Sequence, residues 1–310
     1  GKSAVPQRKP TSDQTSDQSS SKPRPKPQPT AKKHGNGFGD IAGMEDLKQR
    51  VKEGFINVLQ HRDLADAYGI RPPSMLFYGP AGCGKTFFAE KMAEEVGIHF
   101  IKVVPDDLAS TMVHGTQEKI GEVFKNAERH APALLFFDEF DAMVPRRTGN
   151  EYNQHYDSEV NEFLCMLNHA SDKGVYVLAA TNHPERIDKA VLRTGRIDEL
   201  VYVDMPDHEA RKSLFALELA KLPREEGIDM DRLAHMTQRY NCSDINYIVK
   251  SAARKKFNEA VGCGEHTLQN ITQKQLEEII SGRSPSVSSR DLREYQRVHS
   301  EFSPKDKGGQ

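Results

Sequence analysis

The chain has 310 residues, enough for one large or two modest domains, and its formal net charge of −2 argues for no particular charged partner. No apolar run approaches the roughly 18 residues that span a bilayer, and no signal peptide is visible, so neither a membrane-spanning nor a secreted protein is expected. The 4 cysteines form no CxxC pair and the 12 histidines show no ligand-like clustering, which indicates a reducing, cytoplasmic setting without structural zinc.

Residues 1–37 are rich in Pro, Ser, Lys and Gln and almost free of large apolar side chains, a composition that predicts a disordered tail. Through His34 this tail carries a net charge of +6. Its basic side chains leave two interpretations open: a solvated tether to another domain, which the composition favours, or an electrostatic anchor for nucleic acid or an acidic partner.

Residues 38–205 begin with helical patterns and then alternate strand and helix signals. The predicted strands are Ser74–Tyr78, His99–Val104, Ala133–Asp138, Val175–Ala180 and Glu199–Val203. Several are continuous apolar runs, as in parallel strands that are buried on both faces. Together these signals predict a doubly wound α/β core with a five-stranded parallel sheet.

Beyond residue 205 the pattern is helical only, and residues 206–303 predict a small all-helical domain that ends in an amphipathic helix within residues 283–303. Ser243 is predicted to cap one of these helices. Residues 304–310 are polar and predict a second disordered tail.

Residues 79–86 read Gly-Pro-Ala-Gly-Cys-Gly-Lys-Thr and lie between the first predicted strand and a helical pattern. This is the spacing of the Walker A phosphate loop, in which glycines let successive N–H groups turn inward at a helix N-terminus. Lys85 is expected to reach the β- and γ-phosphates of ATP, and the Thr86 hydroxyl to bind Mg²⁺. A glycine-rich turn without a ligand is the alternative, and the apolar helical face that follows the loop disfavours it.

An apolar strand ends in Asp138 and Glu139, the Walker B arrangement. Asp138 is expected to hold Mg²⁺ together with Thr86, and Glu139 to orient and deprotonate the attacking water. Asn182 ends the next strand, where it either positions water or is an ordinary turn residue.

Two arginines, Arg193 and Arg196, lie three residues apart after that turn. A guanidinium spreads its charge over phosphate oxygens and accelerates phosphoryl transfer when a neighbouring subunit supplies it. Taken alone, the two arginines are solvated surface charges.

The combined motifs resemble the AAA branch of the AAA+ ATPases over roughly residues 38–303. Residues 39–43 are similar to the adenine-contacting segment of that family, and Asn182 to its sensor-1 residue. Residues 181–198 resemble its second region of homology, in which the two arginines fall on arginine-finger positions. Residues 284–292 resemble the closing segment of the valosin-containing protein, spastin and katanin groups. The ATPase module of membrane-bound AAA proteases is also similar, but the HExxH motif of those proteases does not follow here.

This resemblance implies a RecA-like P-loop NTPase core with a helical lid, which binds ATP and Mg²⁺. It also implies a homo-oligomeric, hexameric ring that threads or remodels a protein substrate. The implied nucleotide contacts are Asp40, Ile41, Ala42, Pro80, Ala81, Gly82, Cys83, Gly84, Lys85, Thr86, Phe87 and Asp138. Two other functions stay open: a nucleic-acid-associated AAA+ module and a nucleotide-controlled assembly switch.

The sequence departs from the family pattern at four places, one of which is Glu218, near the position of a usual His that contacts the nucleotide. Met112, Val113 and His114 replace the aromatic-hydrophobic-Gly pore loop, although a polarizable Met is able to grip a chain. Thr194 replaces the usual Pro between the two arginine fingers. Residues 242–244, Cys-Ser-Asp, replace the usual Gly-Ala-Asp of the lid.

Overall fold

The computed structural model describes residue 1 and residues 35–108, 115–146, 163–192, 195–262 and 268–302. Its five strands form one parallel sheet in the order β2-β3-β4-β1-β5. They are β1 Met75–Tyr78, β2 His99–Val103, β3 Ala133–Phe137, β4 Val175–Thr181 and β5 Glu199–Tyr202. Each end lies within one residue of the predicted position, and the predicted α/β fold with its five-stranded parallel sheet is confirmed.

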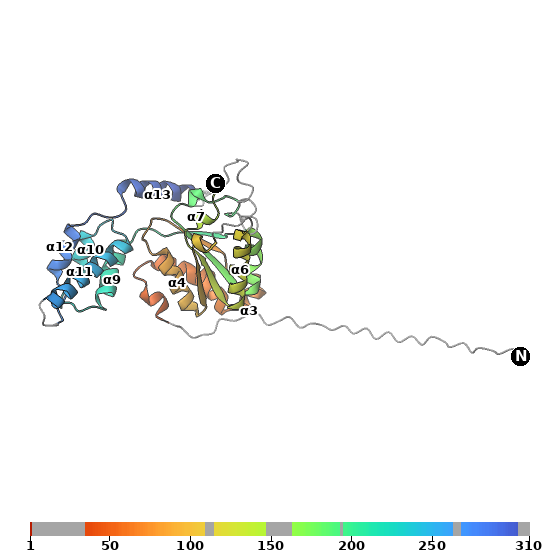
Figure 1. Cartoon of the computed structure of the whole chain (residues 1–310), viewed down its shortest axis with the longest axis horizontal. Coiled ribbons are helices and arrows are strands. Elements are labelled where there is room, and N and C mark those ends of the chain that lie inside the picture. The colour runs from red at the N-terminus through yellow and green to blue at the C-terminus, as the bar shows by residue number, and fades with distance from the viewer. Residues whose placement is uncertain (2–34, 109–114, 147–162, 193–194, 263–267, 303–310) are drawn as a thin grey trace, which may run out of the picture.

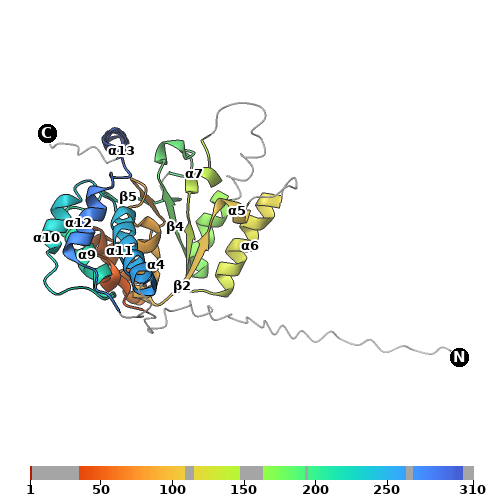
Figure 2. The same cartoon turned by 60° about the vertical axis from the view of Figure 1, so that its left-hand side comes forward.

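The sheet is covered on both faces, and the side chains of β3 alternate between them. Leu134 and Phe136 join the apolar cluster that includes the helix α4, Lys85–Val96. Leu135 and Phe137 join the opposite cluster, which includes α6, Gly115–Arg129. Figure 2 shows α4 and α6 on the two sides of the strands. Because both faces are packed, the strand is apolar throughout, as its sequence predicts.

Shorter elements complete the core. They are η1 Gly37–Asp40, α1 Glu45–Val51, the π-helical turn η2 Lys52–Ile56, α2 Asn57–Gln60, α3 Arg62–Ala67, α5 Pro105–Leu108, α7 Phe140–Met143, η4 Ser171–Lys173 and η5 Pro184–Arg186. Residues 163–170 are also helical. The predicted helical patterns before β1 therefore correspond to several short helices.

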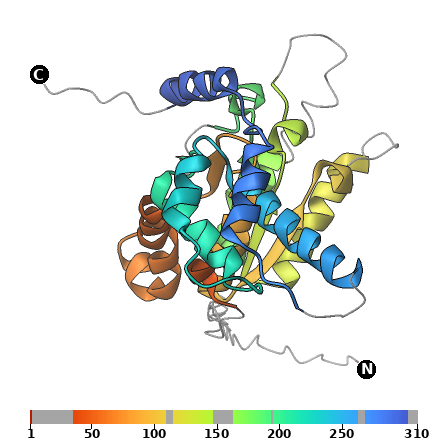
Figure 3. The same ribbon diagram turned by 90° about the vertical axis from the view of Figure 1, so that its left-hand side faces the viewer.

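After β5 the described chain is helical and packs around its own apolar cluster. The helices are α9 His208–Leu219, α10 Met230–Met236, α11 Cys242–Gly262, α12 Gln273–Ser281 and α13 Ser289–Phe302. Figure 1 shows α9 to α12 grouped beside the core, and Figures 1 and 3 show α13 above them. We call residues 206–288 the lid.

The last helix, α13, returns to the core. His299 stacks on Tyr202 with ring centroids 4.1 Å apart, and its Nδ1 lies 2.9 Å from the Tyr78 hydroxyl. Figure 1 shows α13 crossing from the lid towards the core. No described helix is long and apolar enough to cross a membrane.

Candidate functional site

The phosphate loop connects β1 to α4, and its lysine is held inside the loop. Gly84 has a φ of 84°, a left-handed conformation that glycine adopts without strain, and α4 begins at the next residue. The Lys85 Nζ donates to the carbonyl oxygens of Gly79 at 2.9 Å and Pro80 at 2.8 Å. Burial lowers the pKa of Lys85 to about 8. The ammonium is thus desolvated at the place where an anion would bind.

Three neighbouring strands bring the predicted polar residues to one edge of the sheet. Strand β4 lies between β3 and β1, so the loop after β1, Asp138 after β3 and Asn182 after β4 meet at the carboxyl edge. Thr86 Oγ1 donates to Asp138 Oδ2 at 3.0 Å. This is where ligands of open α/β sheets bind.

The oxygens of Thr86 and Asp138 suit Mg²⁺ in type and spacing. Magnesium prefers hard oxygen ligands in octahedral geometry at 2.0–2.1 Å, so two adjacent ligands lie about 3 Å apart. The two side-chain oxygens are 3.0 Å apart. These residues therefore fit the predicted metal site.

Glu139 projects from an uncommon backbone conformation. Its φ of 52° is left-handed, and its N–H donates to Asp138 Oδ1 at 3.1 Å. Non-glycine residues in this region concentrate at functional sites, because the surrounding structure must enforce the strain. The Glu139 side chain is exposed, and Asn182 is half-buried. Within the described part of the chain, neither side chain has a hydrogen-bond partner, so both are available to a ligand.

Lys102 is a site residue that the sequence analysis missed. Its Nζ lies 2.8 Å from Asp138 Oδ2, the same oxygen that accepts from Thr86. Lys102 is on β2, which pairs with β3 and so runs beside the Asp138 strand. A lysine within a predicted strand, two residues before the strand's predicted end, was the available signal.

The segment expected to contact adenine lies between core and lid. Ile41 packs in the core cluster with α4, whereas Ala42 packs against the lid cluster. The Asp40 carboxylate accepts from Asn36 at 3.0 Å and pairs with Lys91 of α4 at 2.9 Å; these contacts lower the pKa of Asp40. Phe87, another expected contact, is 45% exposed on α4.

Cys83 faces the core rather than the inside of the phosphate loop. Its side chain is fully buried, with Sγ 3.5 Å from the sulfur of Met205, and burial raises its pKa to about 12. Only the backbone of Cys83 is therefore positioned for phosphate. The thiol is also unreactive at neutral pH, because the thiolate is the nucleophilic form.

The lid contacts the phosphate loop directly. Asn241 is 3% exposed and its Nδ2 donates to the Ala81 carbonyl at 3.0 Å. Ser243 donates its backbone N–H to the Gly82 carbonyl at 3.1 Å. A Cβ on Gly82 would lie only 2.3 Å from Asn241 Nδ2, so glycine allows this approach.

The start of α11 differs from the prediction that Ser243 caps it. The Asn241 Oδ1 accepts from the Asp244 N–H at 2.8 Å, and Asp244 Oδ2 accepts from the Asn241 N–H at 3.3 Å. This reciprocal pair is a capping box, so Asn241 is the cap and the helix begins at Cys242. The hydroxyl of Ser243 instead points to the Gly82 carbonyl, at 3.4 Å.

Asp244 also joins this cap to the chain beyond α12. Its carboxylate is 2% exposed and accepts from Arg283 at 2.8 Å and from the Ser286 hydroxyl at 2.9 Å. Ser286 in turn accepts from Asn241 Nδ2 at 2.9 Å. We call Asn241, Asp244, Arg283 and Ser286 the lid latch. Sequence reasoning missed its role at the loop.

The remaining predicted residues divide into two groups. Arg196 is half-buried and donates to the Ala190 carbonyl of its own chain at 2.7 Å. Arg193 and the pore-loop residues Met112, Val113 and His114 lie outside the described residues. Their roles stay predictions.

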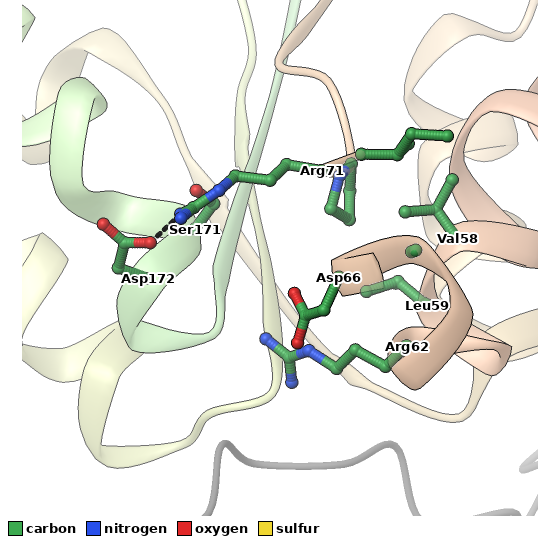
Figure 4. Close-up of a pocket in the computed structure, with 10 residues that line it drawn as sticks. Val58, Leu59, Arg62, Asp66, Arg71, Ser171 and Asp172 are labelled. Atoms are coloured by element: carbon green, nitrogen blue, oxygen red, sulfur yellow. Dashed lines mark hydrogen bonds and ion pairs between the residues drawn. The ribbon is translucent and has the colours of Figure 1, made fainter. Parts of the chain in front are cut away.

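A separate pocket lies at the other end of the sheet. Figure 4 shows it between α3 and the turn before β4, with Arg71 paired to Asp172 across it. Ser171 and Asp172 precede β4, so this pocket is at the amino edge and is remote from the phosphate loop.

Comparison with known proteins agrees with this geometry. The family described as ATPase family associated with various cellular activities (AAA) matches residues 75–205. A cell division cycle protein 48 homolog of Archaeoglobus fulgidus is 32% identical over 273 residues, which cover 85% of this chain and 37% of that protein. A putative cell division cycle ATPase of Plasmodium falciparum is 32% identical over 261 residues, which cover 84% of this chain and 21% of that protein.

The chain therefore spans well under half the length of these two relatives. The family match begins at β1 and ends just after β5, so it contains the phosphate loop and the carboxyl edge of the sheet. The similarity to the two relatives extends over most of the chain. With its P-loop nucleotide site, the chain belongs to the AAA family of ATPases.

Proposed function

We propose that this chain hydrolyses ATP with Mg²⁺ at sites shared between subunits of a ring, and uses the reaction to remodel a protein substrate. The observation that carries the proposal is the convergence at one sheet edge of Lys85, Thr86, Asp138 and Glu139, with Thr86 bonded to Asp138 at 3.0 Å. Phosphoryl transfer depends mainly on positioning and on charge stabilisation, which such a cluster provides.

Each residue at this edge has a role in hydrolysis. With ATP bound, Lys85 would exchange its bonds with the loop carbonyls for phosphate oxygens. Thr86 and Asp138 would hold Mg²⁺, which would supply positive charge against the phosphates. Glu139 accepts the proton of the attacking water, and Asn182 orients that water.

Two features support a shared site coupled to movement. The resemblance of residues 181–198 to the second region of homology supports Arg193 and Arg196 as groups that act on a neighbouring subunit's ATP. The lid latch supports a mechanical link, because Asn241 bonds the phosphate loop itself. A change in the loop on hydrolysis would therefore reach the lid through a few directional bonds.

The protein substrate is supported by likeness alone. The two relatives are called cell division cycle proteins, and their likeness to this chain is the reason for a remodelling role. Threading by Met112, Val113 and His114 stays a prediction. The nucleic-acid alternative depends on the basic residues within 2–34, which also lie outside the described part.

The test is steady-state ATPase activity measured against protein concentration, with light scattering to give the mass. We expect the rate per subunit to rise as the protein assembles. A constant rate per subunit from a protein that stays monomeric would exclude shared sites. Stimulation by DNA with a steep salt dependence would instead favour the nucleic-acid alternative.

A second experiment addresses the substrate. Glu139→Gln should bind ATP and assemble but not turn over, so it should retain its client. Proteins that remain bound to this variant with ATP are then identified by mass spectrometry, with Lys85→Ala as the control that cannot bind nucleotide. Equal recovery from the two variants would contradict ATP-dependent capture.

A further inference from the structure

The first turn of α9 and the short helix α10 bring two histidines and an aspartate together on the lid. His208 Nε2 lies 3.0 Å from Asp231 Oδ1, and His235 Nε2 lies 3.7 Å from Asp231 Oδ2. The two imidazole rings are 4.5 Å apart at their centroids. The sequence prediction that the histidines do not cluster is therefore wrong at this place, because the fold joins residues 23 positions apart.

The spacing of these atoms matches the ligand set of a transition metal. Zinc binds imidazole nitrogen at about 2.0–2.1 Å and carboxylate oxygen at about 2.0–2.2 Å, so tetrahedral ligand atoms lie about 3.4 Å apart. The separations of His208 Nε2 from Asp231 Oδ1, 3.0 Å, and of His235 Nε2 from Asp231 Oδ2, 3.7 Å, lie on either side of this value, although each involves a different carboxylate oxygen. One ligand atom from each of the three residues falls within 4.8 Å of the others.

The backbone that carries the three side chains is fixed by buried contacts. Asp207 caps α9 by accepting from the Ala210 N–H at 2.7 Å, which sets the place of His208. The Arg211 guanidinium, 7% exposed, donates to the Ala234 carbonyl from Nε at 3.3 Å and from Nη2 at 3.1 Å. Ala234 precedes His235, so this bond holds the two helices together beside the cluster. Such support is what a metal site needs from the residues around it.

Asp231 faces an excess of donors when no metal is present. Its carboxylate is approached by His208, His235 and also Lys212, whose Nζ lies 3.5 Å from Oδ1. The structural alternative is a surface carboxylate that accepts from all three. Neutral imidazoles, however, offer nitrogen lone pairs, and these suit zinc rather than the oxygen-seeking Mg²⁺ or Ca²⁺.

We propose that His208, Asp231 and His235 bind a divalent transition-metal ion of the zinc class, which joins α9 to α10. Asp231 and His235 are exposed and His208 is half-buried, so the fourth coordination position faces solvent and takes water. The site is distinct from the proposed Mg²⁺ site, since it uses two nitrogens and lies on the lid. The first turn of α9 also packs closely against Gly43. If residue 43 carried a Cβ, that atom would lie 2.5 Å from the Cβ of Ala210.

The test is isothermal titration of the chelator-treated full chain with zinc chloride alone, without nucleotide. We expect binding that His235→Ala and Asp231→Ala each weaken at least tenfold. His235 is exposed on its helix, so its replacement removes few packing contacts. The matched control is His61→Ala, an exposed histidine outside the cluster, which should bind zinc like the wild type. Equal zinc affinity in all four proteins would overturn the site.

A second variant is expected to bind zinc more tightly than the wild type, a result that misfolding cannot produce. Lys212→Ala removes a positive charge 3.5 Å from Asp231, so zinc should bind about 3- to 10-fold more tightly. Weaker zinc binding by Lys212→Ala than by the wild type would contradict an ion placed beside Asp231.

Discussion

The sheet and the lid latch both hold the phosphate loop, but by different kinds of interaction. Strands β1, β3 and β4 are buried at every position and mostly apolar, so the loop leaves the core from a buried support. Asn241 and Asp244 of the lid latch are buried as well, yet the latch consists of hydrogen bonds and the Asp244–Arg283 ion pair. Apolar burial is strong and non-directional, whereas polar contacts require a definite geometry. The phosphate loop is thus fixed where it leaves the sheet. Where it contacts the lid latch, it can respond to the nucleotide that it binds.

The largest effect in this comparison should come from the sheet. Leu134→Ala removes a fully buried side chain between β3 and α4 and should lower the free energy of unfolding by about 3 kcal/mol. Urea denaturation measures this loss. The control is Leu64→Ala, because Leu64 is 60% exposed, and its change should stay below about 0.5 kcal/mol. Equal losses in the two variants would contradict the assignment of the core.

The next effect should come from the ion pair of the lid latch. Asp244→Ala leaves Arg283 without its carboxylate and should cost about 2 kcal/mol, below the value of a fully buried pair because Arg283 is 30% exposed. Glu294→Gln, which weakens a surface pair with Arg297, is the control and should cost less than about 0.5 kcal/mol. ATP affinity should fall only in Asp244→Ala, since Asp244 orients Asn241.

The same carboxyl predicts a pH dependence. Burial raises the pKa of Asp244, but hydrogen bonds from Arg283, Ser286 and Asn241 outweigh it, so the pKa lies below its ordinary value of 3.8. Its stabilising contribution is therefore present above about pH 4 and is lost as the pH falls through the lowered value. Wild type and Asp244→Ala should thus converge in stability under acid. A difference between them that stays constant down to pH 2 would refute this linkage.

A smaller effect should reveal the contact between loop and lid. Gly82 has a φ of 75°, and its Cβ would meet Asn241, so Gly82→Ala should cost about 1–2 kcal/mol. Asn241→Ala removes the hydrogen bond to the Ala81 carbonyl, and it also removes the side chain that a Cβ on residue 82 would meet. The double variant should therefore be more stable than the sum of the two losses predicts, by about 0.5–1 kcal/mol in urea denaturation without nucleotide. Strict additivity would mean that the lid does not touch the loop.

The smallest effect concerns the proton on Lys85. Burial lowers its pKa to about 8, so part of the free protein carries a neutral lysine at alkaline pH. Phosphate oxygens favour the charged form, and ATP binding should therefore take up a proton. Affinity should fall about twofold between pH 7 and pH 8. Calorimetry in two buffers of different ionisation enthalpy measures the uptake, and none at pH 8.5 would contradict a desolvated lysine.

The sheet could be predicted from the sequence because its signals are local. Each strand is a short apolar run, and Gly-x4-Gly-Lys-Thr fixes the position of the loop between a strand and a helix. Thr86 and Asp138 were expected to hold Mg²⁺ together because they belong to the Walker A and Walker B motifs. The bond between them has the geometry that this reasoning requires.

The lid latch and the His208–Asp231–His235 cluster could not be predicted in this way. Asn241 contacts a loop residue 160 positions earlier, and no local pattern records such a distance. The start of α11 was missed by two residues, since Ser243 and Asn241 are both good caps and only the reciprocal bonds with Asp244 distinguish them. Tertiary contacts decided both cases.

The most direct test of the central claim mixes two inactive variants. Glu139→Gln retains both arginines, and the double variant Arg193→Ala Arg196→Ala retains the catalytic glutamate. If each ring site takes its glutamate from one subunit and its arginines from the next, a 1:1 mixture should assemble intact sites at about a quarter of positions. We predict that the mixture regains ATPase activity that neither variant has alone. A mixture as inactive as its components would contradict a site shared between subunits.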